Sequence, residues 1–435
     1  MASTVDGLVS GLSTSDLISQ LMSVEAASQT RLRNKAKVEQ GVVTAYQSVN
    51  TKIAAVKSAS EGLITTALSK PWTAAKATSS DKTAVAATAA NGAAHGELTF
   101  NVKNLANAQI TTAKFATAAT AATTGNFVDI SIDGAAATRV NIDPTKNTPQ
   151  GVADAINAAG LAVKAAAITA ADGSSVLQLT GTKTGSVGDF TITGLTVAPA
   201  NVADAVDATI EVGNPLTSGY AVKSPNNTFT NLMQGVTLTA IAVKDGVTVS
   251  VKPDSDGLAS KMQAMVDSVN GALTEMAKQS TYDQTIKLGQ PLNGNSTVRG
   301  IQQDLVSTIS SGATGGFGSY KKIGIELDKS GKLTFDRAKF VAAYEVDPTG
   351  TESVVSTQLA TNFKDVAVEA DKNIAAAING RTTRITDLNK QVADWDIRLD
   401  TRKAALQRQF SNLETSLSSL RNQSNWLAGQ LSRLG

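Results

Sequence analysis

The feature that most constrains the fold is a stripe of apolar residues at heptad spacing near the C-terminus. Its members are Phe410, Leu413, Leu417, Leu420, Leu427, Leu431 and Leu434, and the polar Ser424 fills one position of the series. Apolar residues that recur every three or four positions are typical of a helix that buries one face against another helix. Because chain ends fray unless something covers them, the stripe predicts a partner.

A second heptad pattern lies near the N-terminus, in a stretch without proline from about Ser15 to Leu68. Its apolar members are Val42, Tyr46, Val49, Ile53, Val56 and Leu63. A continuous helix over this stretch would be roughly 80 Å long. Ser13 and Asp16 have the spacing of a helix cap at its start, and Pro71 is expected to stop it.

Helical spacing also dominates from Ile374 to the end of the chain. We expect the N-terminal and C-terminal helices to pair with each other as a coiled-coil arm, which is the most economical way to bury two apolar stripes in one chain. The residues expected in this coiled-coil arm are Val49, Ile53, Val56, Leu388, Val392 and Leu399.

The middle of the chain, from about Trp72 to Asp254, is predicted to be rich in β-strands. Short runs alternate between apolar and polar residues and are bounded by Gly, Asn, Asp or Pro. Two runs, DISIDGAAATRVNID and ITAADGSSVLQLT, contain Asp-Gly turns of the kind that close hairpins. One exception reads as a short helix that begins at Thr148 and Pro149.

The predicted fold class is therefore an α+β multidomain protein, in which helices at both ends form a coiled-coil arm or bundle and β-rich head domains are inserted between them. Helical spacing near Leu258 and a hairpin in IGIELDKSGKLTFD complete the plan. The expected parts are an N-terminal helical arm (1–71), a discontinuous first β-rich head domain (72–112 with 219–255), an inserted second head domain (113–218), a helix and hairpin region that packs on the arm (256–373) and a C-terminal helical arm (374–435).

Composition argues against several functions. The chain has no cysteine and one histidine, His95, in a polar loop-like stretch, so we expect no metal, no cofactor and no catalysis. The formal net charge is +2, and the basic run TRLRNKAK scatters its charges around a helix, so no nucleic-acid partner is expected. No stretch has the roughly 20 apolar residues of a membrane span, and no cleaved signal peptide is recognisable.

Apolar residues at both ends of the chain are the candidate assembly and docking residues. They are Leu8, Leu12, Leu17, Ile18, Leu21, Leu420, Leu427, Leu431 and Leu434. One interpretation is that they only complete an intramolecular coiled coil. We favour burial against other molecules, because contiguous exposed apolar surface marks an interface.

Several segments, in order, resemble the bacterial flagellar filament-capping family, also called hook-associated protein 2. They include VDGLVSGLSTSDLISQLMSVE at the start, GELTFNVKNLANAQ, GVADAINAAGLAVKAAAI, SPNNTFTNLMQGVTLTAIAV, MVDSVNGALTEM and QFSNLETSLSSLRNQSNWLAGQL. The resemblance covers nearly the whole chain. Departures include Ser13, Met265 and Val269, where the family usually has Asp, Phe and Tyr.

The resemblance implies a non-enzymatic homo-oligomer of about five subunits, which sits at the distal tip of the flagellum, outside the cell. It implies export through the flagellar type III apparatus without a cleaved signal peptide, and a role in folding and inserting flagellin. The partners that it implies are flagellin, the hook-filament junction protein and an export chaperone. Two alternatives remain at this point: another axial or junction protein of the flagellum, and a coiled-coil surface adhesin.

Overall fold

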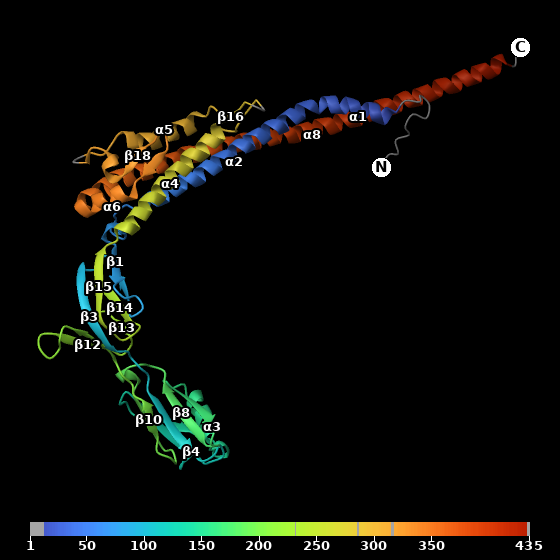
Figure 1. The fold of residues 1–435 in the computed structure, drawn as a ribbon. Coiled ribbons are helices and arrows are strands. Elements are labelled where there is room, and N and C mark those ends of the chain that lie inside the picture. Colours follow the sequence, from blue (N-terminus) through green and yellow to red (C-terminus); the bar gives the residue numbers. More distant parts are fainter. Residues whose placement is uncertain (1–12, 231, 285–286, 315–316, 433–435) are drawn as a thin grey trace. The chain divides into compact units, whose positions relative to one another are not determined.

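The computed structural model describes residues 13–230, 232–284, 287–314 and 317–432, and the chain forms two compact units (Figure 1). The helical unit consists of Met1–Thr65 and Ala259–Gly435, and the β unit consists of Thr66–Leu258. β-rich sequence is thus inserted between two helical segments, which confirms the predicted fold class.

The helical unit is built from the two ends of the chain. Its helices are α1 (Thr14–Glu25), α2 (Ala27–Glu61), α4 (Ser255–Ser280, which begins in the β unit), α5 (Ser296–Ser310), α6 (Arg337–Val346), α7 (Pro348–Glu352) and α8 (Thr361–Leu431), with a 3₁₀ turn at Tyr320–Ile323 and a π-helical segment at Ser353–Ala360. Two short hairpins accompany them, β16 (Tyr282–Asp283) with β17 (Leu288–Gly289) and β18 (Ile325–Leu327) with β19 (Leu333–Phe335).

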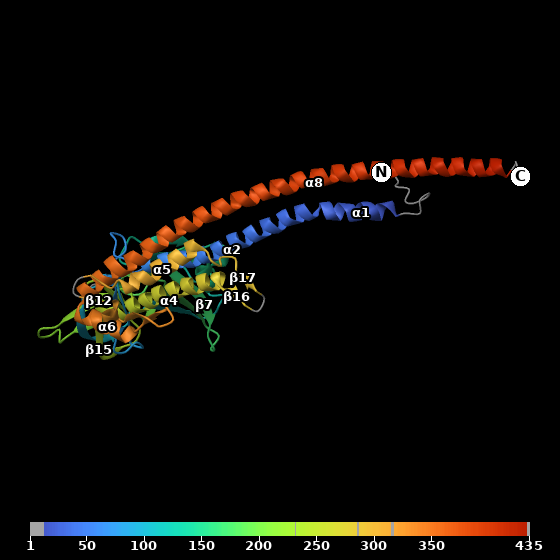
Figure 2. The same ribbon diagram turned by 90° about the horizontal axis from the view of Figure 1, so that it is seen from above.

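Helices α1 and α2 run antiparallel to α8, and together these three helices are called the arm below (Figures 1 and 2). The direction follows from cross-helix hydrogen bonds: Asn50 bonds to Asp371 at 2.8 Å, while Gln29, nearer the N-terminus, bonds to the carbonyl oxygen of Val392, farther along α8, at 3.2 Å. The expected pairing of N-terminal with C-terminal helix is therefore present in one chain.

The N-terminal helix ends earlier than expected, and it is divided into α1 and α2 near its start. It ends at Glu61, ten residues before Pro71, because the chain turns at Gly62 to bury Leu63, which is 0% exposed. Ser13 caps its start as predicted, with its side chain accepting from the N–H of Asp16. Ala26 separates α1 from α2 but keeps right-handed helical backbone angles.

The β unit contains two lobes, each with its own core. In the first lobe, a five-stranded sheet in the order β1-β15-β3-β11-β12 faces a three-stranded sheet in the order β13-β14-β2. The strands are β1 (Ala75–Ser79), β2 (Val85–Ala89), β3 (Gly96–Asn104), β11 (Ala208–Val212), β12 (Tyr220–Ser224), β13 (Thr228–Phe229), β14 (Val236–Ala240) and β15 (Lys244–Pro253). A 3₁₀ turn at Pro71–Thr73 precedes them.

The second lobe pairs a four-stranded sheet, β10-β4-β8-β7, with a three-stranded sheet, β6-β5-β9, and one helix, α3 (Pro149–Ala158). Its strands are β4 (Ile110–Phe115), β5 (Phe127–Ile132), β6 (Thr138–Asn141), β7 (Val163–Thr169), β8 (Ser175–Gly181), β9 (Phe190–Thr193) and β10 (Ala200–Ala203), with 3₁₀ turns at Pro144–Lys146 and Ser186–Gly188. Strand β11, inside the segment 113–218 that we expected to form the inserted domain, pairs with β3 in the first lobe.

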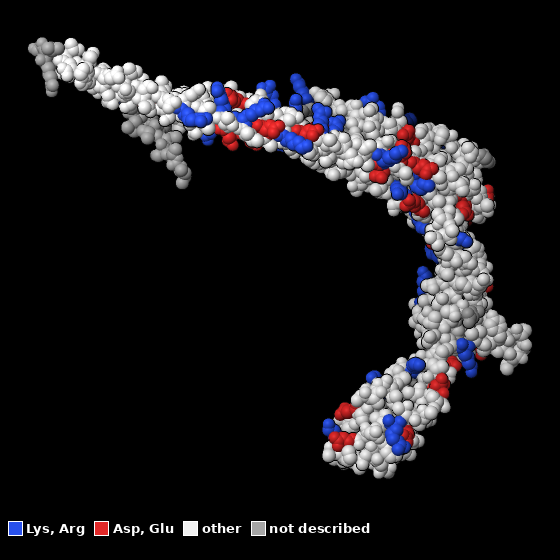
Figure 3. Space-filling view, turned by 180° about the vertical axis from the view of Figure 1, so that it is seen from behind, with Lys and Arg blue, Asp and Glu red and all other residues white. Residues whose placement is uncertain are grey.

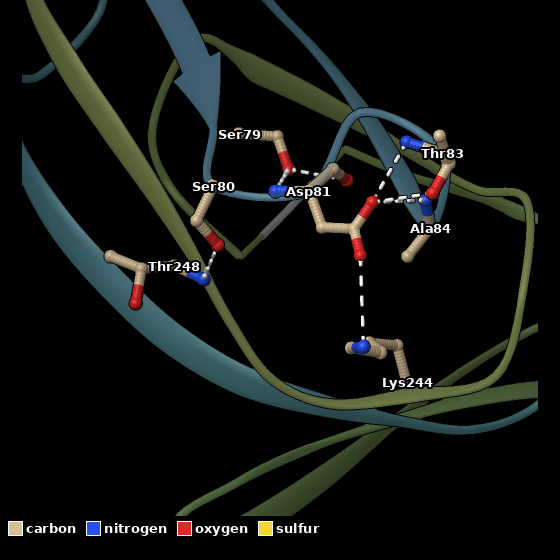
Figure 4. Close-up of polar contacts among 7 residues, drawn as sticks. All are labelled: Ser79, Ser80, Asp81, Thr83, Ala84, Lys244 and Thr248. Atoms are coloured by element: carbon tan, nitrogen blue, oxygen red, sulfur yellow. Dashed lines mark hydrogen bonds and ion pairs between the residues drawn. The ribbon is translucent and has the colours of Figure 1, made fainter.

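Two of the crossings between the sheets of the first lobe lead from β1 to β2 and from β14 to β15. Asp81, in the first of these crossings, forms an ion pair with Lys244, at the end of the second (Figure 4). Asp81 lies between β1 and β2, where its carboxylate accepts hydrogen bonds from the N–H and hydroxyl of Thr83 and from the N–H of Ala84. Lys244 begins β15 after the chain returns from β14, and its Nζ lies 3.9 Å from Oδ2 of Asp81. These bonds, with that of Thr83 the strongest, lower the pKa of Asp81.

The two lobes are joined by the loop that follows β8. The N–H of Gly185 donates to the carbonyl oxygen of Asn107, and the N–H of Ser186 donates to the carboxylate of Asp207 at 2.7 Å. Gly185 has a φ of +76°, and a Cβ at this position would lie 2.4 Å from Cα of Pro225. Only glycine therefore fits where the loop of the second lobe meets the first lobe.

Candidate assembly site on the arm

The C-terminal part of α8 carries an exposed apolar stripe. Leu413 is 48% exposed, Leu420 60%, Leu427 56% and Leu431 65%, and α8 continues beyond α1 (Figures 1 and 2). Leucines spaced by three, four or seven residues lie on one face of a helix. Within the described part of the chain, nothing covers this face, so it is free to bury itself against another helix.

The docking residues predicted near the N-terminus lie on α1 as far as they are described. Ile18 is buried, at 8% exposure, whereas Leu17 and Leu21 are exposed on the same helix. Helix α1 contacts α8. Leu8 and Leu12, and Leu434 at the other end, lie outside the described residues.

The residues predicted for the coiled-coil arm lie at three different levels of it. Val49, Ile53 and Val56 are fully buried on α2, at the level where Asn50 meets Asp371. Leu388 and Val392 lie farther along α8, where Gln29 reaches it, and Asp371 and Leu388 are about 25 Å apart along the helix. Leu399 lies farther still, next to the Glu25–Arg402 ion pair.

A search for apolar residues alone misses the polar side chains of the seam between α2 and α8. Glu39 is 8% exposed and pairs with Arg381, and with Arg384 at 3.2 Å. Gln29 is 5% exposed and also donates to the carboxylate of Asp396. The signal that could have found Glu39 is spacing, since it lies three residues before Val42 and continues the heptad of α2 toward its N-terminus.

Charged side chains are distributed unevenly along the arm. Figure 3 shows Lys, Arg, Asp and Glu along its middle, and mostly uncharged surface toward the C-terminal end of α8. Between residues 409 and 432 only Glu414 and Arg421 are charged. The exposed leucine stripe is therefore flanked mainly by Ser, Asn and Gln, which favours contacts that depend little on a partner's charge.

Two other kinds of site were sought in the described parts of the chain. Among them, no group of three or more His, Asp or Glu side chains is placed to hold a metal ion. None of the described helices is long and apolar enough to cross a membrane.

Comparison with known proteins connects this arrangement to one family. A sequence profile described as the C-terminus of flagellar hook-associated protein 2 matches residues 205–422, and the profile for the N-terminus of the same protein matches residues 10–109. The first profile alone spans half of the chain.

Named relatives are similar over nearly their whole length. Flagellar hook-associated protein 2 of Escherichia coli K12 is 25% identical, over 98% of this chain and 97% of its own. The B-type protein of Pseudomonas aeruginosa is 24% identical, over 93% of this chain and 87% of its own. A crystal structure of domains D1–D2–D3 of the flagellar cap protein FliD from Escherichia coli superposes with a TM-score of 0.58 at 24% identity, over 78% of this chain and 99% of that one. That likeness supports the fold.

Proposed function

The chain belongs to the flagellar hook-associated protein 2 family, and from this premise we propose that it caps the distal end of the bacterial flagellar filament. In this role it is a homo-oligomer of about five copies that promotes the folding and insertion of exported flagellin. It reaches the tip by type III export without a cleaved signal peptide. Its further partners are the hook-filament junction protein and an export chaperone.

The single observation that carries the proposal is the exposed stripe of α8. A helix with leucines along one face and few charges is suited to lie against other helices of a filament end. Full burial of each leucine contributes about 1.5–3 kcal/mol, and ordering the chain end offsets part of that gain. Contacts of this kind hold a cap in place and still let it move when a subunit is added.

The β unit supplies the other half of the proposed role. Both lobes have closed apolar cores, so they fold without help from the arm's stripe. In the cap they form the plate under which a new flagellin subunit folds. The plate needs no catalytic group, because protection from solvent and from other chains is enough for folding.

Deleting residues 423–435 tests the docking role. We expect the β unit to fold as before and filament growth to stop, measured as swimming motility and as flagellin secreted into the medium. A sharper version replaces Leu420, Leu427 and Leu431 with serine. Its control replaces Asn422 and Asn425, whose spacing places them on the face of α8 opposite the leucines, with serine. Normal motility in the leucine variant would refute the docking role, as would equal loss in both.

The oligomer is tested by light scattering on the full chain across a range of concentrations. A particle of several copies is expected, and it should weaken in the leucine variant if the stripes contribute to assembly. An axial or junction protein would instead grow into open stacks whose mass rises without limit.

A further inference from the structure

The seam between α2 and α8 contains an ion pair at positions that a coiled coil ordinarily fills with apolar residues. On α2 the positions that face α8 follow the heptad through Gln29, Leu32, Ala36, Glu39 and Val43. On α8 the corresponding positions are Ile378, Arg381, Ile385, Leu388 and Val392. Glu39 and Arg381 are the charged members of the two series, and they meet each other.

Glu39 is held more tightly than a surface carboxylate. Its side chain is 10% exposed, whereas those of Arg381 and Arg384 are 37% and 65% exposed. Each of its two oxygens has its own guanidinium partner, Oε2 with Arg381 and Oε1 with Arg384. Removing the guanidinium partners would leave the carboxylate of Glu39 unpaired at a nearly buried position, which is costly.

Gln29 adds a second fixed contact in the same seam. Its Nε2 donates to the carbonyl oxygen of Val392 at 3.2 Å and to the carboxylate of Asp396, which also pairs with Arg33 at 3.3 Å. A shift of α2 along α8 by one heptad would move Gln29 away from these acceptors. It would also place Glu39 against an apolar position, so both contacts oppose slippage.

We propose that Glu39 and Arg381 select the partner of each arm helix, so that α2 pairs with α8 in a single register. They also oppose pairing of α2 with α2, or of α8 with α8, between different copies. In a parallel pair of α2 helices Glu39 would face Glu39, and in a parallel pair of α8 helices Arg381 would face Arg381. A buried polar contact at a seam position is known to set partner and register in coiled coils at some cost in stability.

The selection applies only to the part of α8 that faces α2. Beyond Leu406 the stripe contains no charged residue, since Ser424 is the polar member of its C-terminal part. The part of α8 that faces α2 therefore pairs with α2 of the same copy. The part beyond Leu406 is left to bind other apolar helices. This pairing rule holds whether or not the protein caps a filament.

A double-mutant cycle on the full chain tests the contact. Glu39→Leu and Arg381→Leu are made singly and together, and arm stability is followed by helical circular dichroism during heating. Each single change should lower the midpoint, because Glu39→Leu leaves Arg381 without its carboxylate and Arg381→Leu leaves the nearly buried Glu39 with Arg384 alone. The double change should restore it to the wild-type value or above, as is common when a buried ion pair becomes apolar. Simple addition of the two losses would contradict the proposed contact.

The selection itself is tested by pairing between copies. Because the chain has no cysteine, Gln40→Cys gives one label site on the exposed side of α2. Donor-labelled and acceptor-labelled copies are mixed at a concentration where the otherwise unchanged chain shows no energy transfer. Energy transfer should appear in the Glu39→Leu, Arg381→Leu variant. Its absence there would overturn the proposal, even if the stability cycle behaves as expected.

A charge-exchanged control separates charge from hydrophobicity. Glu39→Arg together with Arg381→Glu and Arg384→Glu keeps opposite charges across the seam, so these labelled copies should show no transfer. Transfer in this variant as well would mean that the charges do not select the partner.

Discussion

The side-chain amide of Gln109 forms two hydrogen bonds of 2.7 Å with the main chain of Phe190, donating to its carbonyl oxygen and accepting from its N–H. Gln109 precedes β4 and Phe190 begins β9, so one buried side chain links the two sheets of the second lobe. Gln109 is 1% exposed. Water therefore cannot replace these bonds.

Gln109→Leu should destabilise the β unit. Both main-chain groups of Phe190 would lose a buried partner, and each unsatisfied group costs about 1–3 kcal/mol. We expect a loss of about 2–5 kcal/mol in the free energy of unfolding, measured with urea. The matched control is Gln178→Ala, whose amide has only a 3.4 Å contact with Thr180 and which should change stability by less than about 0.5 kcal/mol. Equal effects would contradict this role.

Gly185→Ala should weaken the junction between the lobes. The new Cβ would lie 2.4 Å from Cα and 2.5 Å from the carbonyl oxygen of Pro225, so main chain must move. We expect faster cleavage by a protease between the lobes and a lower melting temperature.

The control is Gly173→Ala, which has a similar φ of +82° but no atom within 4 Å of the new Cβ. It should show only the strain of a left-handed residue, about 1–2 kcal/mol. If both variants lose the same stability, close approach at Pro225 has no additional effect.

Acid should weaken the connection at Asp81. Hydrogen bonds from Thr83 and Ala84 and the charge of Lys244 lower the pKa of Asp81 in the folded protein. The stabilisation is then complete above the unfolded pKa of about 3.9 and is lost as the pH falls through the lower folded value. Asp81→Asn should melt below the wild type at pH 7, and the difference should shrink toward pH 2. A difference that stays constant with pH would show that charge is not involved.

Local chemistry made several parts of the fold predictable from sequence. Ser13 and Thr148 cap helices as their spacing indicated. The Asp-Gly turns form hairpins in which Gly134 and Gly173 have positive φ, as such turns require. The hairpin around Gly331 is also present.

Contacts between distant segments were not predictable in the same way. Strand order places β15 between β1 and β3, although the chain between β3 and β15 includes the whole second lobe. The polar members of the arm's seam were missed because the search followed apolar residues, and Glu39 and Arg381 are recognisable only when the two heptads are read against each other. Whether the exposed leucines bind a filament depends on a second molecule, and it stays a prediction.

Two ion pairs on the arm should differ in strength because they differ in exposure. The side chains of Glu25 and Arg402 are 40% and 51% exposed, and such a pair contributes about 0–1 kcal/mol. Glu25→Gln should therefore hardly change the unfolding of the arm in urea, followed by helical circular dichroism. Glu39→Gln removes the charge that two arginines share at a nearly buried position, and we expect a loss of about 1–3 kcal/mol. Added salt should reduce the small Glu25 effect further and leave most of the Glu39 effect. If the two variants are equally stable, burial does not determine the strength of these contacts.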